Sequence, residues 1–234
     1  RTSNPGIDEM KSMVGEKPWS VLKVTDSERN SSVAQIQTID SDGKSILMFK
    51  IPKVTAGSLF LGNWKTNATN TLNSTKFGVE YDNSLGKPVA VKGWYKYESG
   101  KDYYTCEAPY MTNCPNATKV EGQEYVDEYS IKVSLYTTEE FDNTTYVDCL
   151  TGEEGEKNFY ASSRVVAKGG VEGGSTDGQW KEFTITLDYG DKEFDSNQKY
   201  RFAIVCSSSK DGDKFWGAPG SKLWVDDIEV IYKK

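Results

Sequence analysis

The most informative absence is that of histidine, which does not occur once in the 234 residues. The serine and cysteine nucleophiles of the known catalytic triads depend on a histidine base, and many zinc sites depend on histidine ligands. The sequence therefore excludes Ser-His-Asp and Cys-His catalysis, together with zinc sites that contain histidine.

Long apolar runs and basic clusters are also absent. No stretch of about 18 apolar residues occurs, which excludes a transmembrane helix. The formal net charge is −7, whereas proteins that bind nucleic acids or anionic membranes usually carry a basic surface. We therefore expect no nucleic-acid partner. The chain starts at Arg1 without a methionine or an apolar leader, which indicates a mature or trimmed chain.

Cysteine is scarce, and its four positions are Cys106, Cys114, Cys149 and Cys206. Their spacing contains no C-x-x-C, which disfavours a zinc or thioredoxin-like site. Cys106 and Cys114 could close a small loop as a disulfide in an oxidising compartment. Cys206 lies on the apolar side of an expected strand and suits a buried thiol. The sequence leaves the connectivity open.

Short runs of alternating apolar and polar residues, separated by turn residues, predict an all-β chain. The turn-like segment 40–43 predicts a hairpin between the first two strands. The glycine-rich segment 169–178 lacks the ending of a phosphate-binding loop, so we expect an ordinary loop there. No amphipathic helix is indicated, and the pattern predicts a two-sheet β-sandwich. Strands are expected over 34–38, 46–51, 88–97, 128–137, 159–167, 180–187, 200–206 and 223–232.

Several sequence blocks resemble those of a known family. Gly-Asp-x-Phe-x-Gly-Ala-x-Gly-Ser covers 212–221, after the serine run 207–209 and before Val-Asp-Asp at 225–227. The other blocks are Ala-Gly-x-Leu-Phe-x-Gly at 56–62, Gly-x-Tyr-Lys-Tyr at 93–97 and Trp-x-x-Phe-x-Ile-x-Leu-x-Tyr at 180–189. In these blocks the chain resembles the putative carbohydrate metabolism domain (PCMD) family, secreted jelly-roll proteins of Bacteroidetes.

The resemblance extends over nearly the whole chain and implies a single jelly-roll domain at 1–234, with a long loop insertion at about 101–127. It also implies a secreted protein at the outer-membrane surface or in the periplasm, lipid-anchored before its N-terminus was trimmed. Such a protein would serve a glycan-utilisation system alongside other outer-membrane glycan-uptake proteins.

Aromatic residues next to bends supply a candidate ligand site. Their rings can stack on sugar rings, while a carboxylate or a guanidinium binds sugar hydroxyls. Each aromatic residue could instead pack into the core, and the grouping depends on a strand order that the sequence does not give. The expected ligand-binding residues are Trp64, Tyr97, Arg164, Asp213, Phe215 and Trp216.

A metal site is a further possibility at Asp226. Alternation places Asp226 on an apolar strand face with Trp224 and Ile228, where an unpaired carboxylate is costly. We expect its partner to be either the backbone N–H groups of an adjacent loop or a structural Ca²⁺ ion. Asp8 or Glu9 would complete the calcium site. No cofactor is required by the expected function.

Three functions stay open. Retaining glycoside hydrolases need two carboxylates about 5 Å apart. Glu80 and Asp82 begin such a pattern, but Ser84 and Leu85 stand where the second glutamate would be. We therefore expect a non-catalytic protein that binds an oligo- or polysaccharide. The alternatives are a glycoside hydrolase with carboxylates from different strands, and a structural or adhesive surface module.

Overall fold

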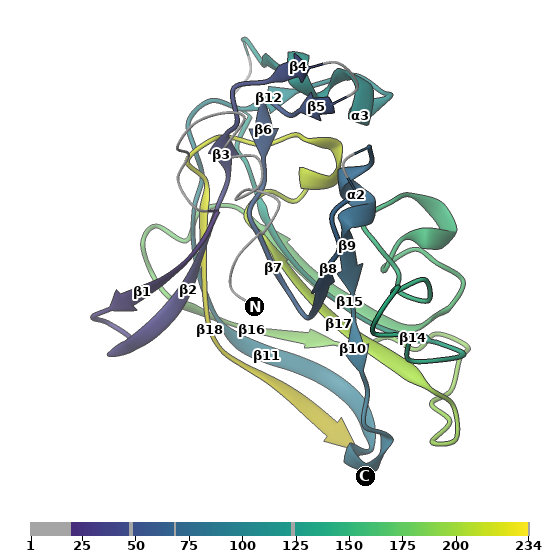
Figure 1. Ribbon diagram of the computed structural model, residues 1–234. Helices are drawn as coiled ribbons and strands as arrows, with labels where there is room; N and C mark the ends of the chain where they lie inside the picture. Colours follow the sequence, from purple (N-terminus) through teal and green to yellow (C-terminus); the bar gives the residue numbers. More distant parts are fainter. Residues whose placement is uncertain (1–19, 47–48, 68, 123–124, 234) are drawn as a thin grey trace.

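The computed structural model describes residues 20–46, 49–67, 69–122 and 125–233, and it is dominated by two antiparallel sheets packed face to face (Figure 1). We call the first the β11 sheet; its strands, in spatial order, are β1 (Val21–Asp26), β2 (Ser31–Gln37), β18 (Lys222–Lys233), β11 (Lys87–Glu98) and β16 (Lys181–Thr186). We call the second the β14 sheet; its strands, in spatial order, are β10 (Val79–Glu80), β17 (Tyr200–Ser207), β14 (Tyr129–Thr137) and β15 (Val165–Gly173), and β7 (Ser58–Phe60) also pairs with β17. The predicted two-sheet β-sandwich of the jelly-roll type is confirmed.

Small two-stranded pairs and short helices surround the two sheets. The pairs are β3 (Ile39–Asp40) with β6 (Val54–Thr55), β4 (Lys44–Ile46) with β5 (Phe49–Ile51), β8 (Gly62–Trp64) with β9 (Thr75–Phe77), and β12 (Tyr104–Thr105) with β13 (Thr118–Lys119). The helices are α2 (Thr71–Ser74), α3 (Tyr110–Asn113), η1 (Asn83–Leu85), η2 (Cys114–Asn116), η3 (Gly155–Lys157) and η4 (Gly212–Lys214). Figure 1 shows β4, β5, β12 and α3 gathered at one end of the sandwich.

The main core lies between the two sheets. Alternate residues of β14 (Ile131, Val133 and Leu135) and of β18 (Leu223 and Val225) are buried in this core. Burial of these side chains is the main force that holds the sheets together, at about 25 cal/mol per Å² of apolar surface.

A second apolar layer covers the outer face of the β14 sheet. Phe77 of β9, together with Leu150 and Phe159 from the segment after β14, packs on Ala203 and Val205 of β17. Every residue of β17 except the last is therefore buried, with no alternation of exposure along the strand. When a sheet is covered on both faces, its strands are buried along their whole length instead of at every second residue.

Three expectations about individual segments are wrong. The segment 34–38 does not form a hairpin with 46–51, because β2 pairs with β1 and β18 instead. The expected strand at 46–51 comprises the last residue of β4 and the whole of β5, which pair with each other. The expected glycine-rich loop is partly strand, since β15 continues to Gly173. Gly169 allows it to approach β16, because a Cβ there would lie 2.4 Å from the Thr186 carbonyl oxygen.

The last strand also departs from simple alternation. Asp227 has a positive φ of 50°, and the pairing of β18 with β11 shifts beside it. This irregularity is a β-bulge, which exchanges the two faces of the strand beyond it. Before the bulge, Leu223 and Val225 face the core, so Trp224 and Asp226 face outward. The expectation that Asp226 lies on the apolar side is therefore wrong.

Residues 101–127, expected to be a long loop, contain β12, α3, η2 and β13. Cys106, Cys114, Cys149 and Cys206 are all buried free thiols, so the suggested disulfide between Cys106 and Cys114 is not formed. Burial raises the pKa of Cys106, the most accessible of the loop's two thiols. No helix among the residues described is long and apolar enough to span a bilayer.

Candidate functional site

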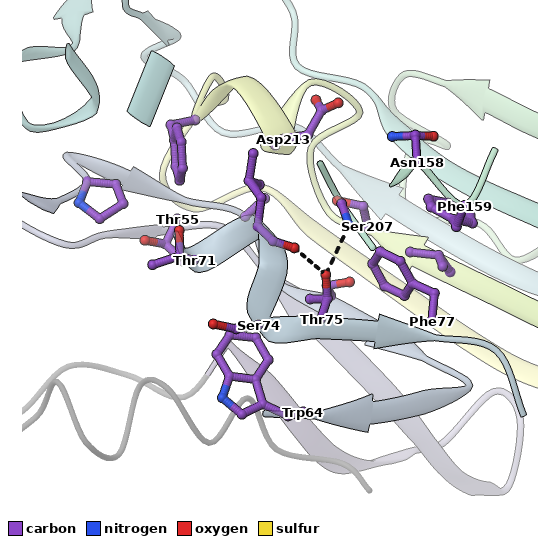
Figure 2. Close-up of a pocket in the computed structure, with 18 of the residues that line it drawn as sticks. Thr55, Trp64, Thr71, Ser74, Thr75, Phe77, Asn158, Phe159, Ser207 and Asp213 are labelled. Atoms are coloured by element: carbon purple, nitrogen blue, oxygen red, sulfur yellow. Dashed lines mark hydrogen bonds between the residues drawn. The ribbon is translucent and has the colours of Figure 1, made fainter. Parts of the chain in front are cut away.

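A cavity of about 300 Å³ lies on the outer face of the β14 sheet (Figure 2). Its floor includes Val205 and Ser207 of β17. Its walls come from the β8–β9 hairpin with α2, from the segment 152–159, and from the loop that contains η4. The aromatic residues that line it are Trp64, Phe77, Phe159 and Phe215. Its volume lies at the lower end of the range usual for small-molecule sites.

A network of short side chains fixes the loop that contains η4. The carboxylate of Asp127 accepts hydrogen bonds from Ser209 Oγ (2.6 Å), Ser221 Oγ (2.7 Å) and the Ala218 backbone N–H (2.8 Å). Ser208 Oγ accepts one from the Gly57 backbone N–H at 2.9 Å. These serines and glycines belong to the sequence blocks at 207–221 and 56–62, so much of the sequence pattern serves to anchor this loop.

The backbone of the same loop aims neighbouring side chains in different directions. Phe215 ends η4 with a φ of 59°, a left-handed conformation that is rare for a bulky residue. Asp213 and Phe215 line the cavity. Trp216 instead packs beside Cys106, Cys114 and Phe215, and its Nε1 donates to the Cys106 carbonyl oxygen at 2.8 Å.

The opposite wall is fixed by the cap of α2. Asn70 accepts a hydrogen bond from the Asn73 backbone N–H, and both asparagine side chains donate to Glu153. Within the cavity, Thr75 Oγ1 donates to the Leu72 carbonyl oxygen at 2.9 Å and accepts from the Gly152 N–H at 3.2 Å. These contacts are the dashed lines in Figure 2. The hydroxyl groups of this wall therefore largely form hydrogen bonds to other groups of the protein.

Asp213 differs from the other charged residues near the cavity. Lys132 pairs with Glu172 at 3.2 Å, Lys214 pairs with Asp211 at 2.8 Å, and Lys210 pairs with Glu128. Asp213 makes no hydrogen bond or ion pair through its carboxylate with any other described residue. It is the one acidic residue among those that line the cavity within the described parts of the chain.

The surroundings of Asp213 raise the pKa of its carboxyl group. The main cause is desolvation by the cavity walls, opposed in part by the positive charges of Lys132 and Lys214. The side chain is nevertheless accessible to solvent. Both facts are consistent with a carboxylate in an open cleft, where water reaches it but much of its hydration shell is replaced by protein.

The structure brings together three of the six residues expected to bind ligand: Trp64, Asp213 and Phe215. In Figure 2, Asp213 and Trp64 lie on opposite sides of α2. The two side chains therefore belong to different parts of the cavity lining.

The other three expected residues do not line this cavity. Tyr97 is fully buried between the sheets, because it shares the core face of β11, and its hydroxyl donates to the Ser208 carbonyl oxygen at 3.0 Å. Arg164 donates from Nε to the Thr137 carbonyl and from Nη2 to the Asp148 carbonyl, both at 2.9 Å. Both side chains stabilise the fold, and Trp216 packs beneath the loop as described above.

The expected partner of Asp226 is also corrected. Its Oδ2 accepts from Arg29 Nε at 3.0 Å and from Ser31 Oγ at 3.1 Å, so a guanidinium and a hydroxyl stand in place of the expected backbone N–H groups, whereas the Ca²⁺ ion stays a prediction. Asp8 and Glu9 lie outside the described residues. No cluster of three or more histidine, cysteine, aspartate or glutamate residues in the described chain is arranged to hold a metal ion.

Sequence reasoning missed several residues that line the cavity. Phe77 lies in a segment rich in asparagine, threonine and serine, which resembles polar surface. The one usable signal there is a phenylalanine within a mostly polar stretch. Phe159 was placed in a strand, although the strand begins only at Val165. Ser207 was noted as part of a serine run but not as a cavity residue.

Comparisons with known proteins agree with this architecture. The model of a family described as "Putative carbohydrate metabolism domain" matches residues 1–231. No curated protein matches. A solved structure described as a putative glycoside hydrolase from Bacteroides thetaiotaomicron is similar with a TM-score of 0.73 and 24% identity; the match covers 97% of this chain.

A second structure, described as a putative glycoside hydrolase from Bacteroides vulgatus, has a TM-score of 0.69 and 26% identity. That match covers 95% of this chain and 82% of the other. The chain spans only 62% of the length of the B. thetaiotaomicron protein. At 24% identity, the likeness to the B. thetaiotaomicron structure shows the fold alone.

Proposed function

The chain belongs to the putative carbohydrate metabolism domain family, and on that premise we propose that it binds an oligosaccharide in the cavity on the β14 sheet without cleaving it. The observation that carries the proposal is the composition of this cavity. Aromatic side chains line its walls, and the unpaired carboxylate of Asp213 reaches into it. Apolar walls with a few placed polar groups are typical of ligand sites.

Each part of the cavity has a role in this proposal. Trp64 at one end offers an indole ring that is partly exposed and can stack on the C–H face of a sugar ring. Phe215 supplies a further apolar wall at the other end, beside Asp213. The carboxylate of Asp213 accepts hydrogen bonds from sugar hydroxyls, and these charge-assisted bonds are stronger than neutral ones.

Glycoside hydrolysis is the second candidate function. It is favoured by the B. vulgatus structure, which is 26% identical and described as a putative glycoside hydrolase. The geometry favours binding, because hydrolysis usually requires two carboxylates roughly 5–10 Å apart across the glycosidic bond. Asp213 is the one carboxylate among the described cavity residues.

The cellular setting is part of the same proposal. A secreted protein, held at the outer-membrane surface or in the periplasm and working with other glycan-uptake proteins, would meet oligosaccharides before they are imported. The Bacteroides source of the two similar structures supports this setting.

A glycan array, followed by an assay for released reducing sugar on every hit, tests the proposal. We expect binding without release, and we expect Trp64→Ala to weaken it by about 5- to 30-fold, because the loss of an aromatic contact costs on the order of 1–2 kcal/mol. Trp224→Ala is the matched control, since Trp224 lies on the outer face of the other sheet. Release of sugar would establish the hydrolase instead. Binding that is lost equally in both variants would place the site elsewhere.

A further inference from the structure

We propose that the end of the cavity at Asp213 accepts a neutral sugar or an amino sugar and discriminates against uronic acids. This inference rests on the proposed function and names the class of sugar ring. Three features carry it: the pairing of the charges around Asp213, the prior use of the neighbouring polar groups, and the apolar character of the adjacent walls.

The first feature is the pairing of charges at this end of the cavity. Lys132, Lys210 and Lys214 each have an acidic partner among Glu172, Glu128 and Asp211. These three cationic groups are therefore already paired, and an incoming carboxylate that binds one of them would have to displace an existing partner. Asp213 has no such partner and leaves one negative charge in excess in this group. Like charges at a desolvated contact are costly, so a uronate is disfavoured here.

Lys50 also lines the cavity, but it extends from β5, and its Nζ donates to Ser45 Oγ at 3.1 Å. The charges that act most strongly on Asp213 are those of Lys132, Lys214 and Asp211. Lys50 is not among the groups that act most strongly on Asp213, and its ammonium already donates to the Ser45 hydroxyl.

The second feature is the prior use of nearby polar groups. The Asn158 side chain donates to the Glu153 carbonyl oxygen and accepts from the Tyr160 and Ala161 backbone N–H groups. Ser207 Oγ donates to the Ser209 carbonyl oxygen. Asp213, by contrast, has a free carboxylate, and this group is an acceptor. The ligand must supply donors, which are hydroxyl or ammonium groups.

The third feature is the apolar part of the cavity wall. Phe215 and Phe159 line the cavity and are largely buried, with exposed fractions of 6% and 7%. A pyranose has this combined character, because it presents apolar C–H faces and donor hydroxyl groups at its rim. Two neighbouring hydroxyls can donate to the two oxygens of one carboxylate.

Two series of oligosaccharides test whether the site discriminates against uronic acids. Within each series, the oligomers are compared on one type of backbone. The first consists of β-1,4-linked tetramers of glucose, glucosamine and glucuronic acid, and the second of galactose and galacturonic acid oligomers. Calorimetry at pH 7.5 gives Kd for the full chain, for Asp213→Asn and for Glu182→Gln. Glu182 is exposed on the outer face of the β11 sheet, so its substitution makes the same change in net charge far from the cavity.

In at least one series, we expect the neutral or amino oligomer to bind at least 10-fold more tightly than the uronic acid oligomer. Asp213→Asn should reduce that ratio below about 3-fold, while Glu182→Gln should leave it unchanged. A uronic acid oligomer that binds as tightly as its neutral partner would overturn this inference and leave the proposed function standing. If no oligomer in either series binds and the glycan array is also negative, both fail. An array hit outside the two series is tested with its own neutral and uronic pair, by the same ratio.

Discussion

Each sheet of the sandwich has an outer face, and each outer face has aromatic and charged residues. On the β11 sheet these are Trp94, Trp180 and Trp224, with Arg29 and Lys96 between them. On the β14 sheet they are the rings around the cavity, with Asp213 at one end. The same types of residue thus occur on both faces, but their partners differ.

On the β11 sheet the cations lie against the rings. The Arg29 guanidinium lies 4.6 Å from the Trp94 ring centre and 5.6 Å from that of Trp180. The Lys96 ammonium lies 5.1 Å from Trp180 and 5.2 Å from Trp224. Such cation–π contacts contribute about 0.5–2 kcal/mol each.

The same two cations are also ion-paired. Arg29 binds Asp226 and Asp227, and Lys96 binds Asp26 at 3.1 Å. The hydrogen bond from the Arg29 backbone N–H, with help from Lys96, lowers the pKa of Asp26. Arg29 lies in the turn between β1 and β2, so these contacts dock that hairpin on the sheet. The two cations that lie against the rings of this face are therefore paired with carboxylates within the molecule.

On the β14 sheet the balance is different. The rings around the cavity contact one another, with Phe77 and Phe159 centred 4.6 Å apart, and no ion pair joins Asp213 to a neighbour among the described residues. A cluster of tryptophans is therefore a weak sign of a binding site. An unpaired polar group next to open apolar walls is the more useful sign. Three predictions test this contrast.

The largest effect is expected at the anchor of the cavity loop. Asp127→Ala removes an acceptor that is 1% exposed and leaves the buried donors of Ser209, Ser221 and Ala218 unpaired. Each unpaired buried donor costs about 1–3 kcal/mol, so the free energy of unfolding should fall by about 4 kcal/mol. Urea denaturation measures it.

Sugar binding should weaken together with stability in this variant, because the loop carries Asp213 and Phe215. Ser221→Ala is the milder control and should cost about 1 kcal/mol. A stability change below about 1 kcal/mol for Asp127→Ala would show that the network does not anchor the loop.

The second effect concerns the opposite face. Arg29→Ala removes the ion pairs with Asp226 and Asp227 and both cation–π contacts. The side chain of Arg29 is only 17% exposed, so we expect a loss of about 2–3 kcal/mol of unfolding free energy. The Kd for the oligosaccharide should change less than 2-fold.

Urea denaturation and calorimetry on the same preparation separate the two results. A large loss of sugar affinity in Arg29→Ala, compared with no loss in Trp64→Ala, would reverse the assignment of the two faces. The β11 sheet would then be the binding surface.

The smallest of the three effects is a dependence of stability on pH. Burial raises the pKa of Asp127 to about 6, although four hydrogen bonds oppose this. Because the pKa of Asp127 is higher in the folded state than in the unfolded chain, its protonated form adds to the free energy of unfolding. This contribution is fully present below the ordinary pKa of 3.8 and is lost as pH rises through about 6. Between pH 4.5 and 7.5 the wild type should lose about 2 kcal/mol relative to Asp127→Asn.

Taking the difference between the two proteins removes the contributions of all other titrating groups, including Asp213. Urea denaturation at several pH values provides the measurement. Parallel stability profiles for the two proteins would mean that Asp127 titrates near its ordinary range.

Much of the fold could be predicted from local patterns. The expected strands at 88–97, 128–137, 180–187, 200–206 and 223–232 lie within one residue of β11, β14, β16, β17 and β18 at most ends. Period-2 alternation is a property of neighbouring residues and is readable along the chain. The hairpin between 34–38 and 46–51 was wrong, because strand pairing is decided by residues distant in sequence.

Part of the candidate site could also be predicted from local patterns. Trp64, Asp213 and Phe215 were found because bends and glycine-rich loops mark them locally. Tyr97 lies in the core because the direction of a strand face depends on which sheet covers it. Arg164 lies in the turn before β15, where backbone carbonyls distant in sequence hold its guanidinium.

The sequence by itself determined that the chain is an all-β sandwich, that it lacks histidine chemistry, and which family it resembles. Only the tertiary structure decided which aromatic residues are free to meet a ligand. Asp226 acquires Arg29 as its partner across a separation of 197 residues, whereas Asp213 acquires no ion-pair partner among the described residues. Charge pairing and desolvation are set by distances in space, and two carboxylates that look alike in the sequence therefore differ in what they can bind.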